Sequence, residues 1–291
     1  MGNFENIDTI VLVGMGLIGG SILKGIKESS YQGYVYGLDK ESKVMEYAFD
    51  EGLIKNKDKV ISPKGKCLIV FCVPALSLEE ALKDLQSYDF LPQETIYTDT
   101  FSAKTRLLEF LEANSHLKQK FVIGHPIAGS EKSGIKNSSK DLFKDKLTLI
   151  SPFKENSNQD ISVVKGFWDS LGSRVLNIEP NLHDMIFART SHLPHIISYS
   201  LMHSLIHKLG HEAFEFSGGS LEDYTRTSSS DPRMWKDVTI SNKEEILSAI
   251  DDFISSLNII KSFISQDNEI EIEKFLRGIK SARDSLIKED S

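Results

Sequence analysis

The sequence contains few cysteines. Of its 291 residues only two are cysteine, Cys67 and Cys72, which excludes a small scaffold held together by disulfides. They lie five positions apart in one apolar segment, and an odd separation on a β-strand turns two side chains to opposite faces. They cannot then bridge to each other. We therefore expect two buried thiols, which suits a reducing compartment.

The sequence also lacks long apolar runs and an excess of basic residues. No apolar run approaches the roughly 18 residues of a membrane-spanning helix, and the N-terminal MGNFENIDT has neither region of a signal peptide. Lys and Arg number 34 against 42 Asp and Glu, a net charge of −8. Nucleic acids and acidic membranes need basic patches, so neither is expected as a partner. We expect a cytoplasmic protein.

The first 180 residues have the pattern of an α/β domain. The whole chain is 40% hydrophobic and 26% charged, as folded proteins are. Short β-rich runs alternate with helical patterns, which predicts a Rossmann-type, doubly wound parallel sheet. The predicted strands are Thr9–Gly14, Tyr34–Asp39, Cys67–Val73, Glu94–Asp99, Phe121–His125, Leu147–Ile150 and Arg174–Ile178.

Residues 181–291 show helical patterns alone. Apolar residues recur every three or four positions from Ile246 to Ile264, which predicts one long helix with an apolar stripe. Glu269–Lys288 reads as a last helix with its apolar side chains turned inward. We therefore predict a Rossmann-type domain over 1–180 and an all-α domain over 181–291. The stripe is expected in a core, and its length also favours a homodimer.

A glycine-rich turn follows the first predicted strand and opens a helical pattern, which is the context that a dinucleotide-binding turn requires. Gly14 allows the tight turn, Gly16 lets the backbone approach a pyrophosphate, and Gly19 lets the helix pack on the strand. The helix N-terminus adds amide donors and partial positive charge for the phosphates. The residues predicted to bind the cofactor here are Gly14, Met15, Gly16, Leu17, Ile18 and Gly19.

Asp39 ends the second predicted strand, twenty residues after Gly19. A carboxylate at this position accepts hydrogen bonds from the ribose hydroxyls of NAD and repels the 2′-phosphate of NADP. Lys40 and Lys43 lie close in sequence and weaken that preference. We predict NAD as the cofactor and leave dual use of NADP open.

Two polar segments follow later strands, at the sheet edge where open α/β sheets bind ligands. Residues 98–104 contain Ser102, and residues 124–131 contain His125. An unperturbed histidine titrates near neutral pH, and His125 is the only one in these segments, so we predict a catalytic role rather than a loop cap. Ser102 can be the N-cap of a helix over 103–111 and still offer its hydroxyl to His125 or a ligand.

The helical half carries further histidines. His192 and His195 are three positions apart and share a helix face if the helix continues across Pro194. No cysteine or carboxylate completes a metal site with the histidines, and we expect no metal. The histidines spaced at multiples of four are His195, His203, His207 and His211.

Asp223 and Arg226 follow a Gly-Gly loop at 218–219. Arginine presents a planar fork of donors that suits a carboxylate ligand. The alternative interpretation is a surface ion pair, which contributes little stability.

These motifs, taken in order, resemble the prephenate and arogenate dehydrogenase family of tyrosine biosynthesis. The resemblance implies an N-terminal NAD domain, a C-terminal helical domain that dimerises, and an active site between them. It implies NAD-dependent oxidative decarboxylation of prephenate to 4-hydroxyphenylpyruvate. The matching segments are GMGLIGGS, TDTFSAK, GHPIAGSE, LHD, SHLPH and DYTRTSSSDPRMW, followed by Asn242.

The resemblance also implies residue roles. His125 matches the catalytic histidine that hydrogen-bonds to the 4-hydroxyl of the substrate, and Ser102 matches the serine that orients that histidine and the nicotinamide. Arg226 matches the arginine that binds a substrate carboxylate. Phe101 departs from the family, which usually carries a small residue there, so the loop conformation is open. The positions implied to bind or gate the substrate are His195, Trp235, Glu131 and Asp223.

Three alternatives stay open. Arogenate has an amino group where prephenate has a keto group, and a charged side chain such as Glu131 or Asp223 could bias the choice. A β-hydroxyacid dehydrogenase would need a catalytic lysine motif in the helical half, where none stands out. A non-catalytic NAD(H)-sensing protein would not need His125, Ser102 and Arg226 together.

Overall fold

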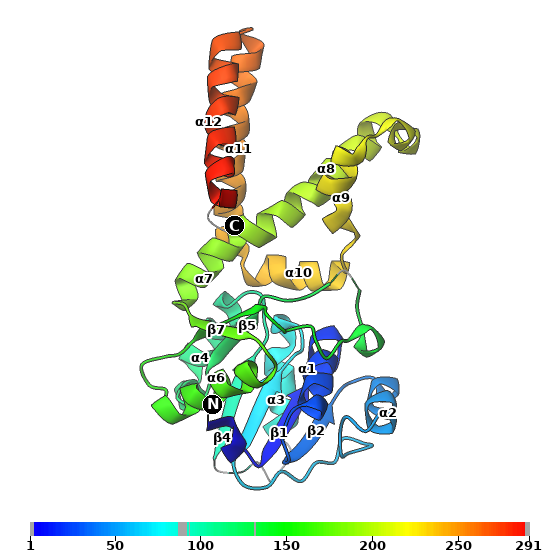
Figure 1. Ribbon diagram of the computed structural model, residues 1–291, viewed down its shortest axis with the longest axis vertical. Helices are drawn as coiled ribbons and strands as arrows, with labels where there is room; N and C mark the ends of the chain where they lie inside the picture. The colour runs from blue at the N-terminus through cyan, green and yellow to red at the C-terminus, as the bar shows by residue number, and fades with distance from the viewer. Residues whose placement is uncertain (1–2, 87–91, 93, 131, 289–291) are drawn as a thin grey trace. The chain divides into compact units, whose positions relative to one another are not determined.

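Figure 1 shows the chain as a computed structural model, which describes residues 3–86, 92, 94–130 and 132–288. Two compact units are present, Met1–Lys243 and Glu244–Ser291. The expected division between residues 180 and 181 stays a prediction.

The larger unit is built on a parallel sheet. Its first four strands pair in the order β2-β1-β3-β4, and every pair is parallel. The chain therefore leaves β1 toward one side and returns to β3 on the other, which opens a crevice at the carboxyl ends of β1 and β3. These strands are β1 (Thr9–Val13), β2 (Tyr34–Leu38), β3 (Cys67–Phe71) and β4 (Thr95–Asp99).

Three further strands pair in the order β5-β6-β7, and a parallel bridge from Tyr97 to Phe121 joins them to β4. β5 (Ile123–Pro126) and β6 (Leu147–Ser151) are antiparallel, so the expectation of a wholly parallel sheet is wrong here. Among the described residues between them, 127–130 and 132–146, the one helical segment is a short 3-10 turn, Ile135–Asn137, whereas a parallel connection usually needs a crossover helix. β6 and β7 (Arg174–Asn177) are joined by such a helix and are parallel.

Helices cover both faces of this sheet. Alternate strand residues point to opposite faces: Ile10 and Leu12 pack in one apolar cluster with α1 and α6, and Val11 and Val13 in another with α3 and α4. The sequence thus forms the predicted three-layer domain. The helices are α1 (Leu17–Glu28), α2 (Ser42–Asp50), α3 (Leu78–Gln86), α4 (Thr105–Ala113), α5 (Ser115–Lys118) and α6 (Asn158–Ser170).

The rest of the larger unit is helical, as predicted for the residues after 181. A π-helical turn at Ala188–His192 leads directly into α8, and Pro194 lies in the first turn of α8, where proline is tolerated. The helices are α7 (Pro180–Phe187), α8 (Leu193–Leu209), α9 (Gly219–Thr225) and α10 (Pro232–Ser241), and 3-10 turns occur at Asn3–Asn6, Ala75–Ser77, His211–Phe216 and Arg226–Ser229.

The smaller unit is a hairpin of two helices, α11 (Lys243–Ser265) and α12 (Glu269–Lys288), which lie side by side in Figure 1. Phe263 and Phe275 contact each other across the hairpin. The expectation that the apolar stripes form a core is only partly met, because two helices alone cannot cover all of their apolar side chains. Those left 47–63% exposed include Leu257, Ile264, Ile279 and Leu286. No described helix is long and apolar enough to cross a membrane.

Candidate active site

A cavity of about 1190 Å³ lies in the larger unit, at the carboxyl ends of the parallel strands. Its walls come from the turns after β1, β2, β3, β4 and β5 and from side chains of α8 and α10. Most of the residues singled out in the sequence meet here although they are far apart in the chain. Those that line the cavity are Gly14, Met15, Gly16, Leu17, Ile18, Asp39, Ser102, His125, His195, Arg226 and Trp235.

Two predicted site residues do not line the cavity, and a third cannot be placed. Gly19 is buried inside α1, where its predicted role is packing. Asp223 lies on α9 and is exposed to solvent. Glu131 lies outside the described residues. The roles suggested for Asp223 and Glu131 stay predictions.

The glycine turn has the geometry that a dinucleotide requires. Gly14 has a φ of +89°, and a Cβ on Gly19 would lie 2.1 Å from the carbonyl oxygen of Gly14. Both positions therefore need glycine for the fold itself. A Cβ on Gly16 would meet nothing within 4 Å, so the backbone there faces open space. The free N–H groups of the first turn of α1 meet that space, which suits a pyrophosphate.

Asp39 is held at the end of β2 by two backbone donors. The N–H of Met15 donates to Oδ2 at 2.7 Å, and the N–H of Glu41 donates to Oδ1 at 2.9 Å. A carboxylate has further lone pairs, so Asp39 can still accept the ribose hydroxyls of NAD. Lys40 forms an exposed ion pair with Glu80 at 2.7 Å. The turn and this carboxylate together fit NAD.

His125 lies on β5 and is only 7% exposed. Its Nδ1 lies 2.7 Å from Nε2 of His183, and its ring packs edge-on against Phe187. Burial holds the pKa of His125 well below its ordinary value, and the nearby Lys104, His183 and His192 act in the same direction. His125 is therefore neutral at neutral pH and able to accept a proton.

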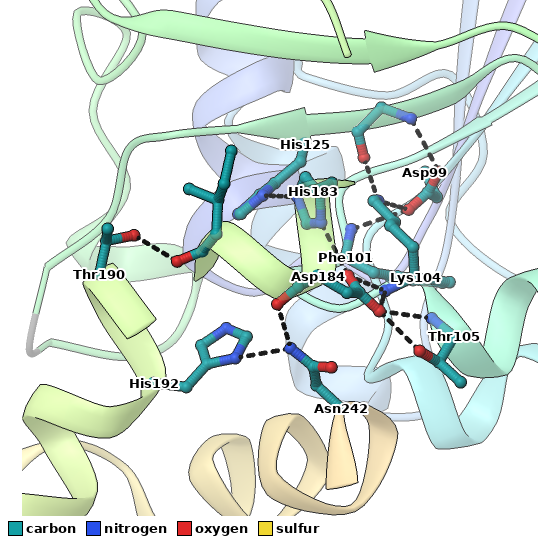
Figure 2. Close-up of polar contacts among 12 residues, drawn as sticks. Asp99, Phe101, Lys104, Thr105, His125, His183, Asp184, Thr190, His192 and Asn242 are labelled. Carbon is teal, nitrogen blue, oxygen red and sulfur yellow. Dashed lines mark hydrogen bonds and ion pairs between the residues drawn. The ribbon is translucent and has the colours of Figure 1, made fainter. Parts of the chain in front are cut away.

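A buried ion pair lies beside His125, as Figure 2 shows. Nζ of Lys104 donates to Oδ2 of Asp99 and to the carbonyl oxygen of Gly124, each at 2.5 Å, and both side chains of the pair are almost completely buried. The carboxylate of Asp99 also accepts the N–H of Gly124 and of Phe101. Burial lowers the pKa of Lys104, and Asp99 opposes that shift. The pair ties β4 to β5 next to the histidine.

Asp184 on α7 caps α4. Its carboxylate accepts the N–H groups of Lys104 and Thr105 and the hydroxyl of Thr105, at 2.8–3.0 Å. α4 begins at Thr105, so Ser102 is not its N-cap, because the buried carboxylate satisfies the free donors instead. Burial would raise the pKa of Asp184, but hydrogen bonds from His183 and Thr105 hold it below its ordinary value.

His192 and His195 line the same cavity, so the prediction that they share a face is confirmed. The ring of His195 stacks on Trp235 with centroids 3.7 Å apart. His192 is buried, and its Nδ1 lies 3.1 Å from the side-chain nitrogen of Asn242. Burial lowers the pKa of His192 to about 4.

Phe101 does not obstruct the cavity. Its ring is 4% exposed and packs in the apolar cluster between the sheet and α3, with Nζ of Lys104 lying 5.7 Å from its centroid. Ser102 next to it lines the cavity and is half-buried. Nδ1 of His125 bonds to His183 rather than to Ser102.

The sequence indicated four of these residues only as parts of motifs: Lys104, His183, Asp184 and Asn242. The adjacent His-Asp pair at 183–184 was a usable signal, but it lies 58 residues after His125. Only the fold brings the two segments together. Within the described ranges no three His, Cys, Asp or Glu side chains gather in a way that could hold a metal ion.

Comparison with known proteins shows which family this chain is similar to. The family model for the prephenate dehydrogenase nucleotide-binding domain matches residues 22–177, and that for the prephenate dehydrogenase dimerization domain matches residues 179–281. The prephenate dehydrogenase of Bacillus subtilis is 29% identical over 283 residues, 96% of this chain and 76% of that protein. The cyclohexadienyl dehydrogenase of Zymomonas mobilis is 29% identical and matches 94% of each chain.

A solved structure is also similar along nearly its whole length. The prephenate dehydrogenase of Aquifex aeolicus, in complex with hydroxyphenyl propionate and NAD+, is 33% identical and superimposes with a TM-score of 0.88. The match covers 96% of this chain and 98% of that one. Two family models that together span residues 22–281 and this likeness establish that the chain belongs to the prephenate dehydrogenase family.

Proposed function

We propose that this chain catalyses the NAD-dependent oxidative decarboxylation of prephenate to 4-hydroxyphenylpyruvate. The single observation that carries the proposal is one cavity that combines the glycine turn and Asp39 with a buried, neutral His125 and with Arg226. Prephenate is a dianion with a ring hydroxyl, and it becomes aromatic when its ring carboxylate leaves. The chain has to orient the substrate, bind its carboxylates and move one proton.

Each part of the cavity has a role in this reaction. Bound NAD supplies the hydride acceptor for C4 of the substrate. The amides of the glycine turn hold the pyrophosphate, and Asp39 holds the ribose. His125 takes the proton of the 4-hydroxyl as the hydride leaves C4, and it returns a proton to that oxygen as carbon dioxide leaves and the phenol forms. No net proton is consumed.

Arg226 is the residue proposed to bind a substrate carboxylate. It is exposed, lines the cavity, and can form two parallel hydrogen bonds with a carboxylate. The stacked pair of His195 and Trp235 forms a flat wall beside it, which suits the substrate side chain and ring. Ser102 also lines the cavity, where its hydroxyl can reach a ligand.

The test is NADH formation by the purified protein with prephenate. We expect NADH, carbon dioxide and 4-hydroxyphenylpyruvate in equal amounts, with NAD preferred over NADP because of Asp39. An Arg226→Ala variant should raise KM for prephenate more than it lowers kcat. A purified, folded protein that binds NAD but leaves prephenate unchanged would refute the proposed function.

A second substrate is favoured by one observation. The similarity to the cyclohexadienyl dehydrogenase of Zymomonas mobilis extends over as much of the chain as the similarity to prephenate dehydrogenases. Arogenate would then enter the same cavity and give tyrosine directly. Comparing kcat/KM for the two substrates decides the matter, and a large preference for arogenate would overturn prephenate as the primary substrate.

We also propose that the domains divide near residue 180 and that the protein is a cytoplasmic homodimer. The family models end at 177 and begin at 179, which supports the division. The exposed apolar side chains of α11 and α12 and the match to a dimerization domain support association of two copies. Two free thiols, Cys67 and Cys72, suit the cytoplasm. Sedimentation that gives the mass of a single chain would contradict the dimer.

A further inference from the structure

Three buried side chains form a chain of hydrogen bonds that ends at His125. Oδ1 of Asp184 lies 2.7 Å from Nδ1 of His183, and Nε2 of His183 lies 2.7 Å from Nδ1 of His125. The exposed fractions of Asp184, His183 and His125 are 3%, 0% and 7%. Figure 2 shows the three in line, with Lys104 and Thr105 bonded to the far side of Asp184. Nothing in the proposed reaction requires His183 or Asp184 to touch the substrate.

The direction of each bond follows from the groups at its ends. Asp184 accepts from three other donors, on Lys104 and Thr105, and is ionised, so it can only accept from His183. Nδ1 of His183 therefore carries a proton. Burial lowers the pKa of His183, although Asp184 opposes that shift, so the ring is neutral and its Nε2 has no proton. That bare nitrogen can only accept, and the donor must be Nδ1–H of His125.

The protonation state of the other ring nitrogen of His125, Nε2, then follows as well. A neutral imidazole carries one proton, so Nε2 of His125 is bare. No described residue forms a hydrogen bond with Nε2, and His125 lines the cavity. The charged and titratable groups around the ring, Lys104, His183 and His192, all disfavour a second proton.

We propose that His183 and Asp184 are positioning residues that fix the tautomer of His125, with Nδ1 protonated and the bare Nε2 presented to the substrate hydroxyl. The kinetic part of this inference rests on the proposed function, and the tautomer itself does not. The opposite arrangement, with His183 doubly protonated and Nε2–H on His125, would place a donor where the reaction needs an acceptor. The two arrangements differ in whether Nε2 of His125 is bare or protonated, which can be observed.

The direct test is nitrogen NMR of the whole, histidine-labelled protein, without substrate. The signals of His125 are assigned as those that disappear in His125→Gln. We expect a protonated Nδ1 and a bare Nε2 on His125, and a protonated Nδ1 on His183. A protonated Nε2 on His125 would overturn the proposal. This outcome does not depend on whether prephenate is the substrate, so it is separable from failure of the proposed function.

The kinetic test uses matched variants of His183. His183→Phe keeps a ring but removes both nitrogens, and kcat should fall about 100-fold or more, since correct general-base catalysis contributes about 10²–10⁴. KM for prephenate and the Kd for NAD should change little. His183→Gln offers an acceptor to His125 and a donor to Asp184, so it should recover part of kcat. A His183→Phe protein with normal kcat, or a folded His183→Gln no better than it, would contradict the role.

Thr105→Val is the control. It removes one hydrogen bond to Asp184 and leaves the bond between Asp184 and His183 in place. We expect normal kcat and the same His125 tautomer. A loss of kcat in Thr105→Val as large as in His183→Phe would mean that general packing around Asp184, rather than the proton position, sets the rate.

Discussion

At the cofactor end of the cavity the chain offers mainly backbone, whereas at the catalytic end it offers buried side chains. The glycine turn, residues 14–19, presents amides and open space over Gly16. At the other end His125, His183 and Asp184 come from β5 and α7 and are bonded to one another. The cofactor end binds its ligand through backbone amides that no side chain covers. The catalytic end depends on the protonation states of its buried side chains.

The difference explains how each end tolerates change. A backbone site depends on steric room, so an added methyl group is the natural way to disturb it. The series of bonds from Asp184 through His183 to His125 depends on each of these three side chains, because a missing one leaves a desolvated group unpaired. Variants at the cofactor end should therefore change NAD binding, whereas variants at the catalytic end should change turnover and stability.

The largest expected effect is on turnover at the catalytic end. His125→Asn removes the proton acceptor, and kcat with prephenate should fall by about 10²–10⁴. The Kd for NAD should stay unchanged, because the glycine turn and Asp39 are untouched. Steady-state kinetics and a fluorescence titration with NADH measure the two quantities. Near-normal turnover in this variant would refute the role of His125.

The next effect is on stability, at the ion pair beside the histidine. Lys104→Met leaves the buried carboxylate of Asp99 without its cation and should lower the free energy of unfolding by roughly 3–5 kcal/mol. Arg106→Met, which breaks an exposed pair with Glu109, is the matched control and should change little. Urea unfolding measures both. Equal losses in the two variants would mean that burial of the Lys104 pair is unimportant.

The structure of each end could be predicted from the sequence only where its residues are close together in the chain. The cofactor end lies in a contiguous motif plus Asp39, so its strand, turn and helix were predicted from sequence. The network at His125 depends on α7 meeting β5 and the start of α4, and no local pattern specifies those contacts. The N-cap assigned to Ser102 was wrong for the same reason, since the cap of α4 comes from Asp184, 80 residues away.

The antiparallel pairing of β5 and β6 was not predicted either, because it too depends on contacts that no local sequence pattern specifies. The alternation of strand and helix predicts parallel neighbours, but strand direction depends on the path of the connection. The apolar stripe of α11 was correctly predicted as a helix, yet exposed side chains such as Leu257 show that packing against α12 does not bury it.

At the cofactor end two alanine variants separate fold from binding. Gly19→Ala places a Cβ against the carbonyl of Gly14 and should cost about 1–3 kcal/mol of stability. Gly16→Ala has room in the free protein, so its melting temperature should be normal while NAD binds about tenfold more weakly, or about 1.4 kcal/mol. Thermal unfolding with and without NAD measures both. Unchanged NAD affinity in Gly16→Ala would place the pyrophosphate elsewhere.

The last expected effect is a pH dependence of stability from the catalytic end, which is small over any one pH unit. Since the pKa of His192 is about 4 in the folded chain and ordinarily 6.5, only the unfolded chain binds that proton in between. Stability should therefore fall as the pH decreases from about 6.5 toward 4, and His192 alone should contribute up to about 1.4 kcal/mol per pH unit. His125 and His183 act in the same direction.

Unfolding in urea at several pH values measures this slope. His192→Gln should flatten it, whereas His116→Gln, at an exposed position, should leave it as it is. Stability that stays constant or rises on acidification through this window would contradict the buried, neutral histidines.

If the cofactor end and the catalytic end of the cavity act together on prephenate, oxidation and decarboxylation are coupled. The most direct measurement is the stoichiometry of NADH, carbon dioxide and 4-hydroxyphenylpyruvate formed by the purified protein from prephenate and NAD. We expect one of each per prephenate consumed. Binding of NAD without any NADH formed from prephenate would contradict this expectation.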